Sequence, residues 1–146
     1  MKSTRLLVIL GLVAVLGVAL WAGEARKPAL KGYCPVCYQA VGKAVEGKPE
    51  LATEFQGQTF YLANADVKKM FEAEPAKYVP AYNGYCATAM AQGKKLEANP
   101  KLFAVKNGRT FLFSSREAKA MFEKDPEGTI AQADAQWTKL QKQAEE

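Results

Sequence analysis

The segment Gly57-Gln58-Thr59-Phe60 recurs 51 positions later as Gly108-Arg109-Thr110-Phe111. In each copy a β-branched and an aromatic residue follow a glycine, as expected where a strand leaves a tight turn. The second copy turns on Asn107-Gly108, the strongest short signal for a β-hairpin, and Gln56-Gly57 is a weaker form of it. We therefore predict two hairpins. Their expected strands are 53–56 with 59–62, and 103–106 with 109–113.

The similarity between the two halves extends on both sides of the hairpins. Such self-similarity marks one supersecondary unit used twice. Because two copies are too few for a solenoid, we expect an α+β fold in which two pseudo-symmetric units share one core. The identical pairs are Gly42/Gly93, Lys43/Lys94, Pro49/Pro100, Leu51/Leu102, Gly57/Gly108, Thr59/Thr110, Phe60/Phe111, Lys68/Lys119, Met70/Met121, Phe71/Phe122, Glu72/Glu123 and Pro75/Pro126.

A helix is expected after each hairpin, with Asn64 or Ser114 as its N-cap. Pro75 and Pro126 should end these helices. Apolar residues then recur at helical spacing from Thr129 onward, which predicts an amphipathic C-terminal helix over 129–142. The core-facing stripes expected are Val67, Met70 and Phe71, then Ala118, Met121 and Phe122, and finally Ile130, Ala133, Trp137 and Leu140.

The N-terminus has the pattern of an export signal. Lys2 and Arg5 precede an uncharged run of 17 residues, 6–22, and small residues follow it. Residues 1–25 are therefore predicted to be a signal peptide cleaved near Ala25, or an uncleaved anchor, since 17 residues lies at the lower limit for a membrane span. Either alternative exports the rest of the chain to the periplasm, where disulfides persist.

Ordered motifs along residues 31–140 are similar to the exported YHS-domain family of small bacterial proteins. They are Gly32-Tyr33-x-Pro35-Val36, Gly42-Lys43-Ala44-Val45, Phe60-Tyr61 with Phe71, Pro75-x-Lys77-Tyr78 with Pro80, Tyr82-x-Gly84-Tyr85-Cys86-Ala87, and Ile130-Ala131-x-Ala133-Asp134-Ala135-x-Trp137-x-Lys139-Leu140. The resemblance implies one YHS-like domain over 31–140, with repeats at about 32–80 and 84–127. It also implies an association with heavy-metal handling, since YHS domains accompany copper-transporting ATPases.

Two departures from this family concern its chemistry. The chain has no histidine, so the Tyr-His-Ser signature is incomplete. Cys34 and Cys37 stand where similar exported proteins read Gly-Tyr-Asp-Pro-Val-Ala, whereas Cys86 matches a cysteine of the family pattern. The CxxC motif is therefore this protein's own addition. Its role has to be inferred from the chemistry of this chain, because the family resemblance does not indicate it.

Cys34 and Cys86 each directly follow a Gly-Tyr pair, one in each repeat, and Cys37 lies three residues after Cys34. Pro35 suits the first position of a helix, which would make Cys34 its N-cap and favour a thiolate there. Cys86 should open the equivalent helix of the second repeat. If the units pack about a pseudo-two-fold axis, the three sulfurs of Cys34, Cys37 and Cys86 converge.

Three roles are compatible with these cysteines. One is a disulfide, either Cys34–Cys37 or one of the two with Cys86, with the third thiol inert. Another is a soft-metal site for Cu(I), which prefers sulfur, with Met90 as a possible thioether ligand on the helical face of Cys86. Zinc would need four ligands, and this set does not supply them. The last is a redox-active dithiol at the CxxC pair.

Other functions lack support in the sequence. Without histidine, Ser-His-Asp and Cys-His catalytic arrangements are excluded, and no phosphate-binding glycine loop is present. The formal net charge is +5 with scattered lysines, which gives nucleic-acid binding no basic patch. The tyrosines near the cysteine turns are expected to be core residues. Asp134 is expected to have an ordinary helix-capping or surface role. We expect an exported, non-enzymatic protein that binds Cu(I), with a membrane metal transporter or a periplasmic redox protein as partner.

Overall fold

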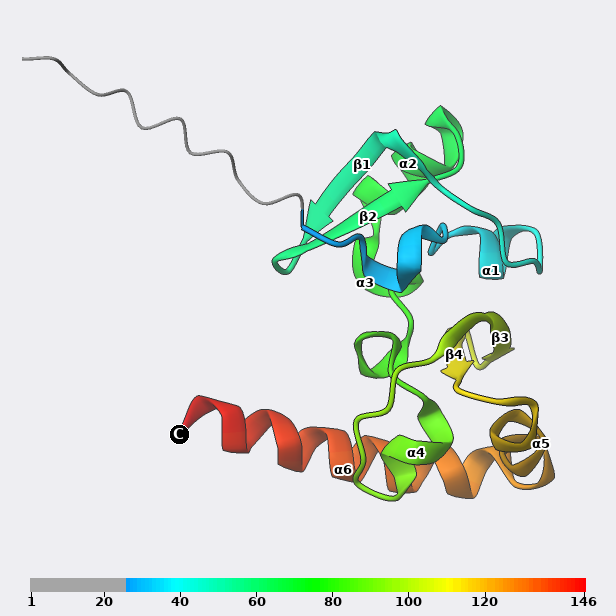
Figure 1. Cartoon of the computed structure of the whole chain (residues 1–146), viewed down its shortest axis with the longest axis vertical. Helices are drawn as coiled ribbons and strands as arrows, with labels where there is room; N and C mark the ends of the chain where they lie inside the picture. The colour runs from blue at the N-terminus through cyan, green and yellow to red at the C-terminus, as the bar shows by residue number, and fades with distance from the viewer. Residues whose placement is uncertain (1–25) are drawn as a thin grey trace, which may run out of the picture.

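A computed structural model describes residues 26–146, which form two units stacked one above the other (Figure 1). The predicted signal or anchor at 1–25 lies outside the described residues. Across 26–146 no helix is long and apolar enough to cross a membrane. The first unit contains η1 (Ala29–Gly32), α1 (Cys37–Ala40), β1 (Lys48–Phe55), β2 (Gln58–Leu62), α2 (Ala65–Ala73) and α3 (Pro75–Tyr78). The second contains η2 (Ala81–Gly84), α4 (Ala87–Ala91), β3 (Asn99–Lys106), β4 (Arg109–Phe113), α5 (Arg116–Lys124) and α6 (Pro126–Glu145).

The predicted mixed α+β class is confirmed, and both predicted hairpins form. β1 pairs with β2 and β3 with β4, each antiparallel. The turns have positive φ at both central residues, 49° and 74° at Gln56-Gly57 and 53° and 71° at Asn107-Gly108. This is the turn geometry that matches the right-handed twist of the flanking strands. β1 and β3 begin earlier than predicted, and the pairing of each shifts register near its start. The shift falls between Lys48 and Ala52 in β1 and between Asn99 and Phe103 in β3.

The helices after the hairpins begin at side-chain caps. Asn64 accepts a hydrogen bond of 3.0 Å from the Val67 amide at the start of α2. In the second unit the cap is Ser115 rather than the predicted Ser114, and it accepts from the Ala118 amide at 3.1 Å. Pro75 and Pro126 follow the ends of α2 and α5, as predicted, and each also begins the next helix. The C-terminal helix therefore begins at Pro126, three residues before the predicted start, and continues to Glu145.

The predicted apolar stripe of these helices is wrong at the methionines. Phe71 and Phe122 are buried, but Met70 is 41% exposed and Met121 is 52% exposed. Each helix packs on its hairpin along a narrow line of residues four apart, such as Val67 and Phe71. A residue one position before the phenylalanine points about 100° away from that line and reaches solvent.

The buried residues form three clusters rather than the single shared core that we predicted. One lies within the first unit around Phe60 and Phe71. Another lies within the second unit around Phe111 and Phe122. A smaller third cluster, centred on Tyr38, Ala98 and Leu112, joins the units. Each hairpin and its own helices enclose most of their apolar surface, so only a small apolar patch remains for the contact between units.

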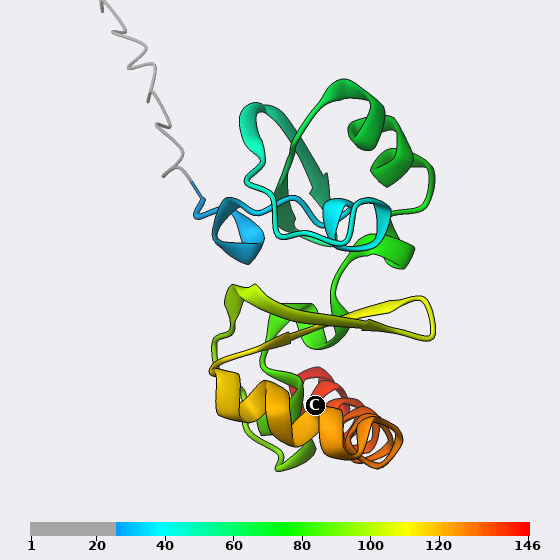
Figure 2. The same cartoon turned by 90° about the vertical axis from the view of Figure 1, so that its right-hand side faces the viewer.

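The β3–β4 hairpin forms the side of the second unit that meets the first, with the first unit on one face and α4, α5 and α6 on the other (Figure 2). Successive side chains of β4 point to opposite faces of the hairpin. Phe111 and Phe113 therefore pack in the second unit's cluster, and Leu112 packs in the cluster that joins the units. From α1, the ring of Tyr38 packs on Phe103 with 4.9 Å between ring centroids. This contact sets the position of α1, and of the CxxC motif that leads into it, against the second unit.

Candidate cysteine site

Cys34 lies between η1 and α1, and Cys37 is the first residue of α1. Three residues in the left-handed region precede them, at Leu30, Lys31 and Gly32. The Cys34 amide then donates a hydrogen bond of 2.8 Å to the Val45 carbonyl. Helix α1 begins at Cys37 with Val36 as its N-cap, so the prediction that Cys34 is the N-cap is wrong. The main-chain hydrogen bond to Val45 holds Cys34 outside the first turn of the helix.

Both side chains of the pair are buried in the first unit. Cys34 is 0% exposed and Cys37 is 4% exposed. They belong to the apolar cluster that includes Phe60 and Leu62 of β2 and Phe71 of α2. The sulfurs are therefore shielded from water, and charge on them needs compensation from nearby donors.

The two thiols act on each other, and their pKa values move in opposite directions. The neighbouring Cys37 thiol is the main cause that lowers the pKa of Cys34 to about 6, against an opposing effect of burial. Main-chain donors at Ala63, Cys37 and Val36 lower it further. The same interaction with Cys34, together with burial, raises the pKa of Cys37. Cys34 is thus stabilised as the thiolate while Cys37 keeps its proton.

The structure places Cys86 in the other unit, away from this pair. It is the N-cap of α4, as predicted, and belongs to the second unit's cluster with Met90, also fully buried. Its sulfur accepts a hydrogen bond of 3.5 Å from the Ser114 hydroxyl. Within 26–146 no three Cys, Asp or Glu side chains gather as a metal site. The predicted convergence of three sulfurs does not occur, because each cysteine turn packs on its own hairpin.

Sequence reasoning missed the residues that donate to the sulfurs. The Ala63 main chain does so for Cys34 in the first unit, and the Ser114 hydroxyl for Cys86 in the second. These two residues are 51 positions apart, so the offset of the repeat relates them. Each directly follows the second strand of its hairpin, which is the signal that could have identified them.

Asp134 has a more definite role than the capping or surface role expected. Both of its carboxylate oxygens accept hydrogen bonds from Arg109, at 2.9 and 3.0 Å, and one also accepts from the Tyr82 hydroxyl at 2.8 Å. The Arg109 hydrogen bond lowers the pKa of Asp134, and the Tyr82 bond adds to this. The carboxylate therefore attaches α6 to β4 and η2, which is a structural role.

Comparisons with protein-family models, with curated proteins and with solved structures found no match to this chain. The chemistry of the site therefore follows from its own residues. Two neighbouring buried thiols, one of them stabilised as a thiolate, can bind a soft ion together or close into a disulfide. Neither reaction needs Cys86.

Proposed function

We propose that the protein binds one Cu(I) ion as cargo through Cys34 and Cys37 alone. The observation that supports this is the burial of the two thiols in one apolar cluster, where each shifts the pKa of the other. Two such neighbouring sulfurs can reach a common ion after a small adjustment. Thiolates select Cu(I) among the metals of the cell, and a two-sulfur set is compatible with it, whereas structural zinc takes four ligands.

The surroundings of the pair also fit a bound soft cation. Two thiolates and one Cu(I) carry a net charge of −1, which must be stabilised inside an apolar cluster. The main-chain donors around Cys34 supply such stabilisation. The nearly complete burial of both sulfurs would then protect the ion from water and from oxidation.

A dithiol redox centre is the second candidate, favoured by the opposite pKa shifts of the two thiols. In this reaction the Cys34 thiolate attacks a partner's disulfide and releases one partner thiolate. Cys37 then loses its proton and attacks the Cys34 sulfur, which releases the second partner thiolate. The partner gains two electrons and the pair becomes a disulfide. Cys34 is fully buried, so a partner protein can reach it only after part of the first unit opens. A metal ion is much smaller and requires a smaller opening.

Anaerobic titration of the reduced protein with Cu(I) against a chromogenic chelator tests the metal proposal. The wild type should bind one equivalent. Cys34→Ser and Cys37→Ser should each weaken binding by more than about 100-fold, since each removes one of two ligands. Cys86→Ser is the matched control, a third buried cysteine, and should change the affinity by less than about threefold.

The same variants distinguish the two candidates. Wild-type affinity no better than that of the Cys34→Ser/Cys37→Ser double variant would exclude the metal site. Equilibration in glutathione buffers would then decide whether the pair cycles as a disulfide. In that case Cys86→Ser should move its reduction potential by less than about 30 mV. A large loss of Cu(I) binding in Cys86→Ser would show that our two-cysteine site is incomplete.

We also propose that the chain is exported and exchanges the ion with a membrane transporter or a periplasmic redox protein. The support is the basic start and apolar run of residues 1–25. Fractionation should recover the protein from the periplasm or the outer face of the inner membrane, and intact mass should report cleavage near Ala25. Recovery from the cytosol alone would contradict export.

Finally, we propose that the two units are pseudo-symmetric YHS-like copies. The support is the shared order of elements, the turns with two positive φ values and the 51-residue offset in sequence. In an experimental structure, 32–80 should superpose on 84–127 over both hairpins and the following helices. Failure of that superposition would leave two unrelated hairpin units.

A further inference from the structure

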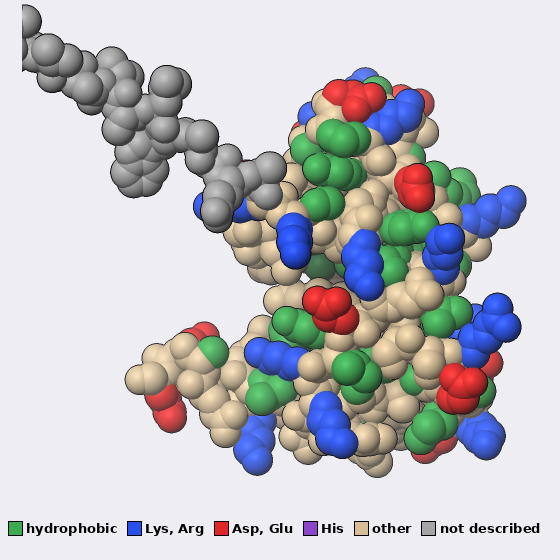
Figure 3. Space-filling view, in the orientation of Figure 1, with side chains coloured by type: hydrophobic (Ala, Val, Ile, Leu, Met, Phe, Trp, Pro, Cys, Tyr) green, Lys and Arg blue, Asp and Glu red, His purple; other side chains and the backbone are tan. Residues whose placement is uncertain are grey.

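A cavity lies at the boundary between the two units, lined by residues of η1, η2 and β4. Its volume is about 510 Å³, within the range of small-molecule sites. Figure 3 shows basic side chains on the upper unit beside this boundary and an acidic one just below it. We call this cavity the junction cleft.

The floor of the junction cleft is apolar and is built by both units. Leu30 of η1 meets Gly84 of η2 there, and Leu112 of β4 lies beside them. Gly84 has a φ of 82°, and a β-carbon on it would lie only 2.8 Å from Leu30 Cδ2. The floor is therefore closely packed and depends on a glycine at this position.

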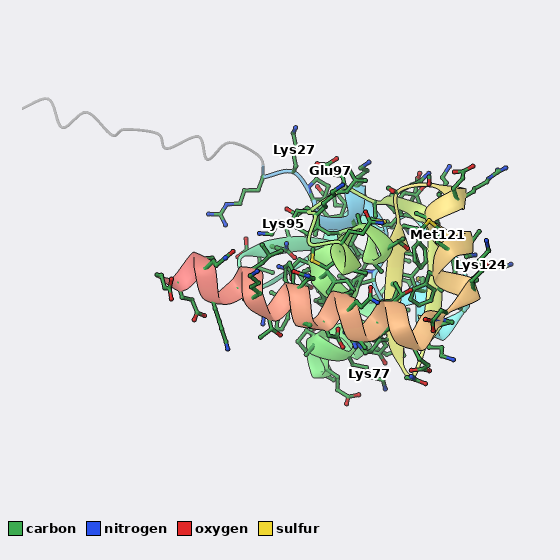
Figure 4. All side chains as sticks on the ribbon, turned by 90° about the horizontal axis from the view of Figure 1, so that it is seen from below. Lys27, Lys77, Lys95, Glu97, Met121 and Lys124 are labelled. Carbon is green, nitrogen blue, oxygen red and sulfur yellow. The ribbon has the colours of Figure 1, made fainter. Side chains whose placement is uncertain are left out.

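The rim carries two positive charges and one negative charge. Lys27 and Lys31 come from the first unit, and Glu97 comes from the second. All three are exposed, and none forms an ion pair with another residue of 26–146. Figure 4 shows Lys27 and Glu97 on the same side of the molecule, with Lys124 well away from both. Three charges around an apolar floor are available to a ligand.

We propose that the junction cleft binds a small peptide-like molecule that carries two carboxylates and one ammonium group. The two lysines match the two carboxylates, Glu97 matches the ammonium, and the apolar floor matches the ligand's body. S-methylglutathione has this set of charges and a size suited to the cleft. It has no free thiol, so its binding does not depend on the cysteine chemistry proposed above.

Calorimetric titration of the full chain with S-methylglutathione tests the proposal. Binding should be detected with a Kd below about 1 mM at low salt, and it should weaken as salt increases. Lys31→Glu and Lys27→Glu should each raise Kd at least about fivefold, because a repulsion replaces an attraction. Lys124→Glu makes the same change of charge outside the cleft and should alter Kd by less than about twofold.

A second probe separates recognition of the ammonium from a simple response to net charge. Glu97→Lys should weaken binding of S-methylglutathione, whose ammonium loses its partner. The same variant should strengthen binding of N-acetyl-S-methylglutathione, which has only the two carboxylates. Tighter binding of both probes by Glu97→Lys, equal effects of Lys124→Glu and Lys31→Glu, or no binding by the wild type would each overturn the proposal.

Discussion

The hydroxyl of Tyr38 donates a hydrogen bond of 2.8 Å to the main-chain carbonyl of Pro100, across 62 positions of sequence. Tyr38 directly follows Cys37, so the candidate site is attached to the second unit through its neighbouring residue. Burial raises the pKa of this hydroxyl, so it keeps its proton and remains a donor at neutral pH.

Tyr38→Phe should lower the free energy of unfolding by about 1–3 kcal/mol, because it leaves a buried carbonyl without its donor. Urea unfolding measures this. Tyr61→Phe is the matched control: its ring is partly buried, and its hydroxyl has no partner among the described residues, so the loss should stay under about 0.5 kcal/mol. Equal losses would mean that the Tyr38 bond contributes nothing specific.

Phe71→Ala and Phe122→Ala should each cost about 3–5 kcal/mol of stability, since both rings are fully buried among aromatic neighbours. The adjacent Met70→Ala and Met121→Ala, together with Lys68→Ala, should cost about 0.5 kcal/mol or less. Denaturant midpoints for the five variants give the comparison. Similar losses at methionine and phenylalanine would refute the helical phase described above.

The reduced, metal-free protein should show one thiol that titrates with a pKa of about 6 by thiolate absorbance. Cys37→Ala should move that transition upward, because the Cys34 thiolate loses the neighbouring thiol that stabilises it. Since the folded pKa lies below the ordinary value of 9.0, this thiolate contributes stability that is complete above pH 9 and is lost as the pH falls through 6. Cys86→Ser should leave the transition in place; if it disappears, the low-pKa thiol has been assigned to the wrong cysteine.

Asp134→Asn should lower stability at neutral pH by about 1 kcal/mol, a modest value because the Arg109–Asp134 pair is nearly half exposed. Arg109 holds the carboxyl pKa below its usual value of 3.8, so this contribution is present above that pH and lost as the pH falls below it. The difference between wild type and variant should therefore shrink between pH 4 and pH 2. A difference that stays constant over this range would show that packing, not charge, is responsible.

Local sequence signals were sufficient for the separate elements. Asn107-Gly108 predicted a hairpin because a two-residue turn needs positive φ at both positions, which these residues adopt at low cost. Asn64 predicted a helix start because its side chain reaches the amide three residues on. The exposure of Met70 was not predicted, because periodicity alone does not say how wide the contact with the hairpin is.

The sequence by itself determined two hairpin–helix units, an N-terminal export pattern and a CxxC pair whose sulfurs must be close. The tertiary structure alone decided that Cys86 belongs to a different cluster from Cys34 and Cys37. It also decided that Lys31 and Glu97 share one cleft. Turns and caps depend on residues a few positions apart, whereas the relation between the units depends on contacts such as Tyr38 with Pro100, whose partners no local pattern specifies.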